Sequence, residues 1–231
     1  MSNLRAWLAD KSPEEQEHFL GEVPRLWVEG GSFDQFCRLL ANYDFIEAKI
    51  NHSQFGVQAL IEDYDLIDDV LSTDAEYTAT AKALKLIQGA LRLSSHVLNQ
   101  DKKQLAGQLT GRLLSFHQPE ITGLIQQVIA TPNTGFRCLT SSLTPPGGAL
   151  IRTLEGHRFW VRAVAITPDG QSVISGSDDM TIKVWDLKSG SEKFTLTGHS
   201  SYVNAVAITP DGQSVISGSD DMTIKVWDLK S

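Results

Sequence analysis

Carboxylate side chains are concentrated in one short stretch of the first half of the chain. Within residues 62–69 there are five of them: Glu62, Asp63, Asp65, Asp68 and Asp69. Carboxylates at regular spacing can enclose a calcium ion, but a calcium loop needs Asp-x-Asp-x-Asp-Gly and a glutamate at its twelfth position. This stretch lacks that order, so a solvated helix face is favoured over a metal site.

The other residue types that could support chemistry are scattered along the chain. His18, His52, His96 and His117 have no histidine or carboxylate at metal-ligand spacing on a shared face. No G-x-x-x-x-G-K-[ST] phosphate loop occurs anywhere in the sequence. The sequence therefore predicts no bound metal ion and no cofactor.

Charge and cysteine content exclude several classes of partner. Lysine and arginine number 20 against 28 aspartates and glutamates, for a net charge of −8. A nucleic-acid binder needs a basic face, and this composition is acidic, so nucleic acid is not an expected partner. A membrane helix needs a run of about 18 apolar residues, and no run in the sequence approaches that length, so no membrane partner is expected. Cys37 and Cys138 form no Cys-x-x-Cys pair. A single disulfide between them stays open, but a reduced, cytoplasmic setting is favoured.

Residues 1–139 show the patterns of an α-helical domain. The segment SPEE at residues 12–15 is a capping box with proline at the first helical position. Between Ala79 and Val97 the apolar residues form two adjoining stripes, which is typical of a helix packed against several others. Gly21 and Pro24 are expected to divide residues 14–29 into two short helices. We expect six to eight helices in an irregular bundle.

The composition changes after residue 139. Residues 140–149, TSSLTPPGGA, have the Ser, Thr, Pro and Gly content of a domain linker. Beyond them apolar and polar residues alternate, as in VRAVAIT, SVISGS and TIKVWDL, with Pro-Asp-Gly turns between. All 27 residues from Ala163 to Ser189 recur 42 positions later. The sequence therefore predicts two repeats of antiparallel strands, 150–191 and 192–231, with nearly superimposable backbones.

A Gly-His pair, a Pro-Asp-Gly turn and a Trp-Asp pair on a 42-residue period resemble the WD-repeat family of β-propellers. The resemblance covers residue 150 to the end of the chain. It implies that each repeat supplies three strands of one blade and the outer strand of its neighbour. IRTLEG, residues 151–156, is then the outer strand of a preceding or closing blade, and the second repeat lacks its own. The expected fold class is multidomain, α plus all-β: an irregular helical bundle followed by two WD-type blades of an incomplete propeller.

This resemblance also implies a structural role for eight side chains. They match the family's hydrogen-bonded tetrad, once per repeat: His157, Ser175, Asp179 and Trp185, then His199, Ser217, Asp221 and Trp227. A serine, a histidine and an aspartate in one place also suggest a hydrolase. Catalysis needs one site, whereas this set recurs in each blade as a structural clamp would. We therefore expect no catalytic residues and no enzyme.

A second set of positions is implied to lie on the top face of the propeller ring. These positions hold Trp160, Arg162 and Asp178 in the first repeat and Tyr202, Asn204 and Asp220 in the second. Aromatic and arginine side chains on a rigid rim are typical of binding hot spots. Some blades of any propeller carry such residues without binding anything, so that alternative stays open. The expected partner on this face is a protein.

The helical half has a resemblance of its own. Residues 84–113, LKLIQGALRLSSHVLNQDKKQLAGQLTGRL, resemble the helical arm domain of signal-transduction ATPases related to apoptotic protease-activating factor. In that family a nucleotide-binding domain precedes the arm, and a propeller senses a ligand and restrains the ATPase. The resemblance implies a non-catalytic interaction, sensing and autoinhibitory arm whose nucleotide-binding domain is not in this chain. The alternative is a free-standing scaffold. In either case further blades are expected, in cis from a longer protein or from other copies of the chain.

Overall fold

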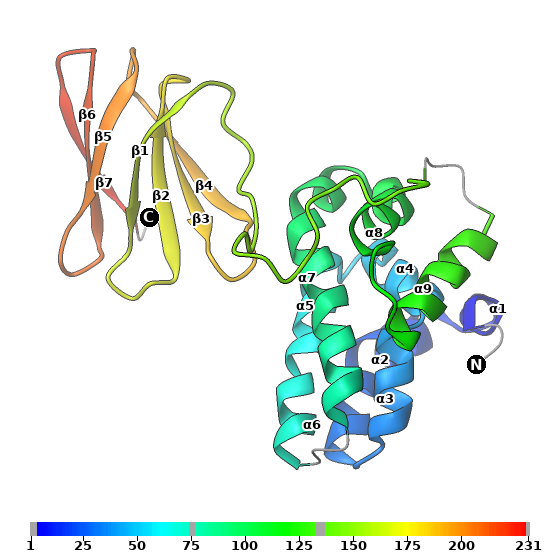
Figure 1. Cartoon of the computed structure of the whole chain (residues 1–231). Coiled ribbons are helices and arrows are strands. Elements are labelled where there is room, and N and C mark those ends of the chain that lie inside the picture. Colours follow the sequence, from blue (N-terminus) through cyan, green and yellow to red (C-terminus); the bar gives the residue numbers. More distant parts are fainter. Residues whose placement is uncertain (1–3, 74–76, 133–136, 230–231) are drawn as a thin grey trace. The chain divides into compact units, whose positions relative to one another are not determined.

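The computed structural model describes residues 4–73, 77–132 and 137–229 (Figure 1). The chain divides into two compact units, Met1–Arg152 and Thr153–Ser231. Within the described residues, the regular structure of the first unit is helical and that of the second is made of strands. The predicted order, helices first and antiparallel strands second, is confirmed.

The helices of the first unit outnumber the six to eight that were expected. The described residues form nine α-helices and a 3-10 turn: α1 (Leu4–Ala9), α2 (Pro13–Glu29), α3 (Phe33–Leu40), α4 (Tyr43–Asn51), α5 (Val57–Asp65), α6 (Ile67–Thr73), α7 (Thr78–Gln100), η2 (Lys102–Gln104), α8 (Leu105–Leu113) and α9 (Pro119–Ala130). Only Leu66 separates α5 from α6. Hydrophobic periodicity is read over windows of about 11–18 residues, so it does not resolve such short elements.

Helix α2 continues through Gly21 and Pro24, so the expected division into two helices is wrong. A proline inside a helix removes one backbone hydrogen bond and costs about 3 kcal/mol or more. Here Pro24 is buried together with Leu20, and the packing of that face offsets the loss. The predicted capping box is confirmed, because the backbone N–H of Glu15 donates to Ser12 Oγ at 3.2 Å and Ser12 N–H donates back to the Glu15 carboxylate.

The core of the helical unit lies around α7, as the wide apolar face of that segment predicts. Leu84, Ile87 and Leu91 of α7 are completely buried. Helices α5, α8 and α9 pack against it, and Figure 1 shows α5 running alongside α7. The hydroxyl of Tyr64, also buried, donates to the carbonyl of Leu40 at 2.6 Å, which ties α5 to the end of α3. One long helix thus organises the bundle.

The Ser-, Thr- and Pro-rich segment at residues 140–149 is held against the helical unit. The backbone N–H of Leu143 donates to the carbonyl of Gly111 in α8 at 3.0 Å. A Cβ placed on Gly111 would lie 2.9 Å from the side chain of Leu143, so the close approach requires glycine there. Arg112 Nη1 donates to the carbonyl of Thr144 at 2.8 Å. Hydrogen bonds and a close side-chain contact therefore fix residues 140–149 against α8.

The second unit contains two antiparallel sheets. The first blade has the order β1 (Val161–Ile166), β2 (Ser172–Ser177), β3 (Thr181–Asp186) and β4 (Glu192–Thr197), and the second blade has β5 (Val203–Ile208), β6 (Ser214–Ser219) and β7 (Ile224–Asp228). The strand register repeats with the sequence: Val164 pairs with Ser175, and Val206 pairs with Ser217. Met180 and Met222 both adopt the left-handed conformation, with φ of 66° and 64°. The prediction of matching backbones is confirmed at these turns.

The segment IRTLEG, residues 151–156, is not a strand, which corrects the sequence-based expectation. An outer strand needs the third strand of its own blade as a hydrogen-bonding partner. In the described part of the unit, β3 already pairs with β4, and the edge of β7 is not paired with residues 151–156. The second blade has three strands among the described residues, as expected.

The two blades pack on each other through apolar side chains. Their buried residues form one cluster, made of Ile174, Ile182, Val184, Val203 and Val215. Gly176 in β2 allows the close approach, because a Cβ placed there would lie 2.7 Å from Cγ1 of Val203. This packing gives the loops at the ends of the strands a rigid base.

Candidate functional site

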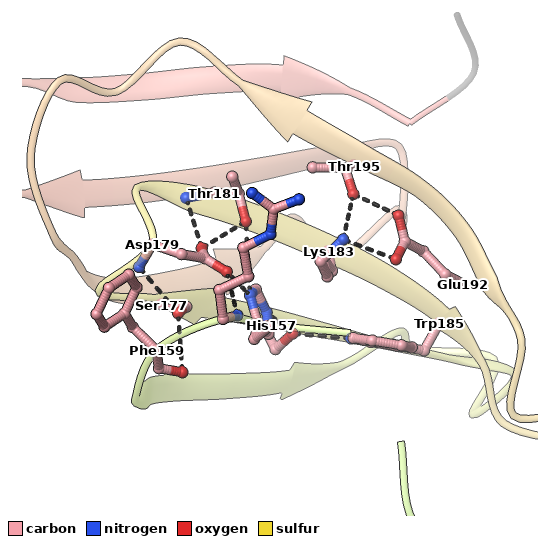
Figure 2. A network of polar contacts seen from close by, with 11 residues as sticks. His157, Phe159, Ser177, Asp179, Thr181, Lys183, Trp185, Glu192 and Thr195 are labelled. Carbon is pink, nitrogen blue, oxygen red and sulfur yellow. Dashed lines mark hydrogen bonds and ion pairs between the residues drawn. The ribbon is translucent and has the colours of Figure 1, made fainter. Parts of the chain in front are cut away.

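The first tetrad joins the loop before β1 to strands β2 and β3 (Figure 2). Nδ1 of His157 lies 2.8 Å from Oδ2 of Asp179, and its Nε2 lies 2.7 Å from Oγ of Ser175. Trp185 Nε1 donates to the same serine oxygen at 2.8 Å. Four side chains from separate elements thus form one continuous chain of hydrogen bonds.

Hydrogen bonds hold Asp179 in its ionised form. Burial opposes the charge, but the Thr181 hydroxyl donates to Oδ1 at 2.6 Å, while His157 and the backbone N–H of Arg158 approach Oδ2. Together these donors lower the pKa of Asp179 well below its usual range. An ionised Asp179 accepts from Nδ1 of His157, which leaves Nε2 to accept from the hydroxyl of Ser175.

The second tetrad repeats this geometry. His199 Nδ1 lies 2.6 Å from Asp221 Oδ2, His199 Nε2 lies 2.8 Å from Ser217 Oγ, and Trp227 Nε1 donates to that oxygen at 2.8 Å. A hydrogen bond from the Thr223 hydroxyl makes the largest contribution to lowering the pKa of Asp221. The structure therefore brings together all eight side chains that the resemblance implied, in two separate groups of four.

The arrangement of each tetrad is closed rather than open to a substrate. Ser175 is buried, and its oxygen already accepts the indole N–H of Trp185. A catalytic serine must present its oxygen to a site where the reacting atom can sit. The same closed geometry in both repeats suits a clamp that fixes the loop carrying His157 to the sheet.

Substitution of Ser175 by alanine tests this clamp. We expect the first blade to lose about 1–3 kcal/mol of stability, because His157 Nε2 and Trp185 Nε1 lose a partner while they stay buried. Hydrogen exchange of the β1–β3 amides in the intact chain measures the loss. Ser200→Ala, at an exposed position, is the control and should change stability by less than about 0.5 kcal/mol. Equal exchange in the two variants would contradict a clamp.

The predicted top-face residues of the first repeat form a fixed group. Trp160, just before β1, is 73% exposed. Arg162 makes two hydrogen bonds to the Asp178 carboxylate, at 2.8 and 2.6 Å, and its guanidinium carbon lies 4.9 Å from the centre of the Trp160 ring. The backbone N–H of Asp178 donates to the carbonyl of Trp160. Both the aromatic ring and the arginine are therefore held in position before any partner arrives.

The corresponding residues of the second repeat continue this surface. Tyr202 is 45% exposed, Asn204 Nδ2 donates to the Asp220 carboxylate, and the Asp220 N–H donates to the carbonyl of Tyr202. The hydrogen bond to Asp178 makes the largest contribution to raising the pKa of Arg162, and Tyr202 and Asp220 add to it from the second blade. The top-face residues of both blades thus lie within electrostatic reach of one another.

One polar group in the first blade was not found from the sequence. Lys183 in β3 donates to Glu192 Oε2 and to Thr195 Oγ1 of β4, both at 2.7 Å (Figure 2). These contacts link the third strand to the fourth. Alternation predicts that each residue lies on a strand, but the pairing register between β3 and β4 is needed to place them side by side.

The acidic stretch at residues 62–69 does not form one solvated face, so that interpretation is wrong for Asp63. Asp63 is buried and lies 2.6 Å from Nζ of Lys49, while Asp65 pairs with Arg92 at 2.8 Å. The helical turn directs successive carboxylates to different neighbours. Among the described residues, no three His, Cys, Asp or Glu side chains are grouped to hold a metal ion.

The cysteines carry free thiols, which settles the disulfide question left open by the sequence. Burial raises the pKa of Cys37 to about 11, so this thiol is neutral at physiological pH. In the described parts of the chain, no helix combines the length and the apolar character that crossing a bilayer would require.

In the comparison with known protein families, the match lies in the repeat region of the chain. The family model of the WD domain, G-beta repeat, matches residues 148–186 and 190–228. The chain is 50% identical over 54 residues to the transcriptional repressor rco-1 of Neurospora crassa, which is 23% of this chain and 9% of that protein. It is 36% identical over 86 residues to human pleiotropic regulator 1, which is 34% of this chain and 17% of that protein.

Two further proteins also match part of the chain. The vegetative incompatibility protein HET-E-1 of Podospora anserina is 57% identical over 68 residues, 29% of this chain and 5% of that protein. A solved structure of U3-55K is 30% identical, with a TM-score of 0.33, and the match covers 33% of this chain and 25% of that one. The chain spans less than a fifth of the length of each of the three named proteins with sequence matches.

Proposed function

We propose that this chain, which carries two WD40 repeats after a helical unit, is a non-catalytic protein-interaction module. The observation that carries the proposal is the preorganised top face. Trp160 and Tyr202 are exposed, and Arg162 is held by Asp178 against the Trp160 ring. Exposed aromatic and arginine side chains on a rigid base are what protein interfaces use as hot spots, and a fixed arginine loses little entropy on binding.

Two features support a protein as the partner rather than another molecule. The net charge of −8 disfavours a nucleic acid, and the top face places two carboxylates, Asp178 and Asp220, beside a single arginine, Arg162. The matched relatives have regulatory names, a transcriptional repressor and a pleiotropic regulator. The tetrads are closed groups, which supports a chain without enzymatic activity. A cytoplasmic setting belongs to the same proposal and is supported by the free thiols.

The finer form of the proposal concerns regulation. The helical unit acts as the arm of a WD-repeat signalling ATPase whose nucleotide-binding domain is not in this chain, and the blades sense a ligand and restrain that ATPase. The order of parts and the resemblance of residues 84–113 support this role. Residues 140–149 are attached to α8 through Arg112 and Gly111. This attachment adds support, because a displacement of the segment would also displace α8.

The top face can be tested by comparing binding partners of matched variants. Trp160→Ala/Tyr202→Ala should lose the proteins that wild-type chain captures from its source cells, because the two exposed rings are removed. Gln171→Ala/Gln213→Ala is the control, as both residues are exposed in the turns between the first and second strands of each blade. Quantitative mass spectrometry of the captured proteins is the measurement. Equal capture by both variants would overturn the proposed binding face.

A second candidate function is favoured by one observation, the apolar faces that the two blades leave open. Ile224 and Val226 of β7 are exposed, as are Val164 and Ile166 of β1. A scaffold that completes a propeller ring with other copies of the chain would bury these residues. In this case the top-face residues would be repeated around an assembly.

A further inference from the structure

Identical residues of the two blades differ in burial. Ile182 is completely buried between the blades, whereas Ile224, its counterpart 42 positions later, is 75% exposed. At the other side of the unit the order is reversed: Val203 is completely buried, and its counterpart Val161 is 50% exposed. The residue types are the same, so the difference comes from what packs on each position: a neighbouring blade and, beside Ile182, strand β4.

The two exposed sets are the two halves of the interface that the chain already contains. We call the first set the tail face, formed by Ile216, Gly218, Ile224 and Val226 of the second blade. The second set is the head face, formed by Val161, Val164 and Ile166 of the first blade. The internal counterparts of the tail face are Ile174, Gly176, Ile182 and Val184, and they pack near the counterparts of the head face, Val203, Val206 and Ile208. A tail face and a head face from two copies therefore have complementary side chains.

Gly218 shows that the tail face has room for another blade. A Cβ placed on Gly176 would lie 2.7 Å from Val203 Cγ1 and 3.1 Å from Val206 Cγ1, so this glycine is required by the blade packed on it. A Cβ placed on Gly218 would meet, among the described atoms within 4 Å, only Cβ of Ala205 at 3.9 Å. The same glycine in the second blade therefore leaves space that no described residue of the chain fills.

The edge of β7 also has the features of a strand-addition site. In the first blade, β4 pairs with β3, with Lys183 opposite Thr195. In the described residues β7 pairs only with β6, so the backbone N–H and C=O groups on the outer edge of residues 224–227 are accessible to a further strand. At the same 42-residue offset Lys225 is the counterpart of Lys183, and Thr153 is the counterpart of Thr195.

The segment before β1 can provide the missing strand. Residues 150–155 align with β4, and Leu154 stands where β4 has Leu196, which packs against the core between the blades. The alignment is weaker at one place, because Leu150 stands where β4 has Glu192, the ion-pair partner of Lys183. The added strand would therefore keep the apolar and hydroxyl contacts of β4 and lack its ion pair.

We propose that the tail face binds the head face of a second copy of this chain, and that residues 150–155 of that copy pair with β7 as the fourth strand of the second blade. This inference rests on the scaffold function proposed above and specifies its contact. Because head and tail differ, the contact is heterologous and continues from copy to copy until a ring closes. Propellers close with about four to eight blades, and with two blades per chain three copies would give a ring of six blades and four copies a ring of eight, both within that range.

Sedimentation of two blocked variants tests the proposed faces. Gly218→Val fills the tail face and Val164→Asp places a charge in the head face. Each variant alone should sediment as a monomer of 25.4 kDa, and an equal mixture should form a heterodimer, since each retains the face that the other lacks. Gly218→Ala, which adds one methyl group, should weaken association at least about tenfold while the circular dichroism spectrum is unchanged.

Cross-linking tests the added strand. Chains carrying Thr153→Cys are mixed with chains carrying Lys225→Cys, both with the partly exposed Cys138 replaced by alanine, so that the engineered pair can form a disulfide only between copies. A covalent heterodimer is expected on oxidation. Leu154→Cys replaces Thr153→Cys in the control mixture and should cross-link at least about tenfold less, because adjacent residues of a strand point to opposite faces.

The outcomes separate this inference from the function on which it rests. Wild-type chain that stays monomeric at micromolar concentration overturns both. An oligomer that withstands Gly218→Val and Val164→Asp overturns the proposed faces but leaves a scaffold with another contact. An oligomer that depends on both faces but gives no Thr153–Lys225 cross-link overturns the added strand.

Discussion

Replacement of Lys49 by methionine is expected to lower the free energy of unfolding of the helical unit by about 3–5 kcal/mol at neutral pH. Lys49 Nζ lies 2.6 Å from Oδ2 of Asp63, and both side chains are buried. The ammonium group also lies 5.1 Å from the centre of the Phe55 ring. Without the lysine, Asp63 must either keep its charge in the core with no opposite charge or take up a proton there, and both cost stability. Urea unfolding of the intact chain, followed by the helical circular dichroism signal, measures the change.

Three controls make this result specific. Lys85→Met removes the same charge from the exposed pair with Asp68 and should cost less than about 1 kcal/mol. The double variant Lys49→Met/Asp63→Leu replaces the pair by apolar side chains and should regain most of the stability.

The third control is the pH dependence of the stability of Lys49→Met. Burial raises the pKa of Asp63 even beside Lys49, and loss of the lysine raises it further. The folded variant then binds a proton that the unfolded chain releases, so its stability should increase as the pH falls from about 8 to about 4. A loss of under 1 kcal/mol in Lys49→Met would contradict a structural ion pair.

Replacement of Arg112 by alanine is expected to cost about 2–4 kcal/mol and to loosen residues 140–149. The guanidinium group is buried and donates to four neutral acceptors: Ser94 Oγ, Gln108 Oε1 and the carbonyls of Leu93 and Thr144. Burial lowers the pKa of Arg112, and the hydrogen bonds to these acceptors stabilise the charged guanidinium group. One hydrogen bond to a charged group contributes about 1.5–3 kcal/mol to stability when it is measured alone. The contributions of several bonds to the same group add up to less than their sum. The substitution leaves several acceptors buried without a donor.

Two measurements distinguish the global from the local effect of this substitution. Urea unfolding reports the stability of the helical unit, and limited proteolysis reports cleavage within residues 140–149. Arg92→Ala is the control, because Arg92 forms a partly exposed pair with Asp65 and should cost less than about 1 kcal/mol. Faster cleavage at residues 140–149 in Arg92→Ala than in Arg112→Ala would contradict the proposed attachment.

The elements that depend on local signals were predicted from the sequence alone. The capping box at Ser12 and Glu15 formed as expected, because its donors and acceptors lie within one turn of the chain. The strands of both blades followed from the alternation of apolar residues, and the matching turns at Met180 and Met222 followed from the identity of the repeats. The eight residues of the tetrads were placed by a family resemblance, and the binding role of the top face remains a prediction.

The features that depend on distant neighbours were decided by the tertiary structure. Local rules end a helix at Pro24, but the packing of its buried face keeps α2 continuous. The family resemblance implies a strand at residues 151–156, but a strand forms only where another strand offers its hydrogen bonds. Lys49 and Asp63 have ordinary surface residue types, and only the packing of α4 against α5 makes them a buried pair.

The repeats separate the two kinds of information most directly. Ile182 and Ile224 occupy equivalent positions on equivalent strands, and this follows from the identical repeats alone, because strand formation and the direction of side chains depend on the local pattern. Whether each isoleucine is buried was decided only by the tertiary structure, since the hydrophobic effect acts between surfaces that meet. Ile182 meets a neighbouring blade, and Ile224 is exposed.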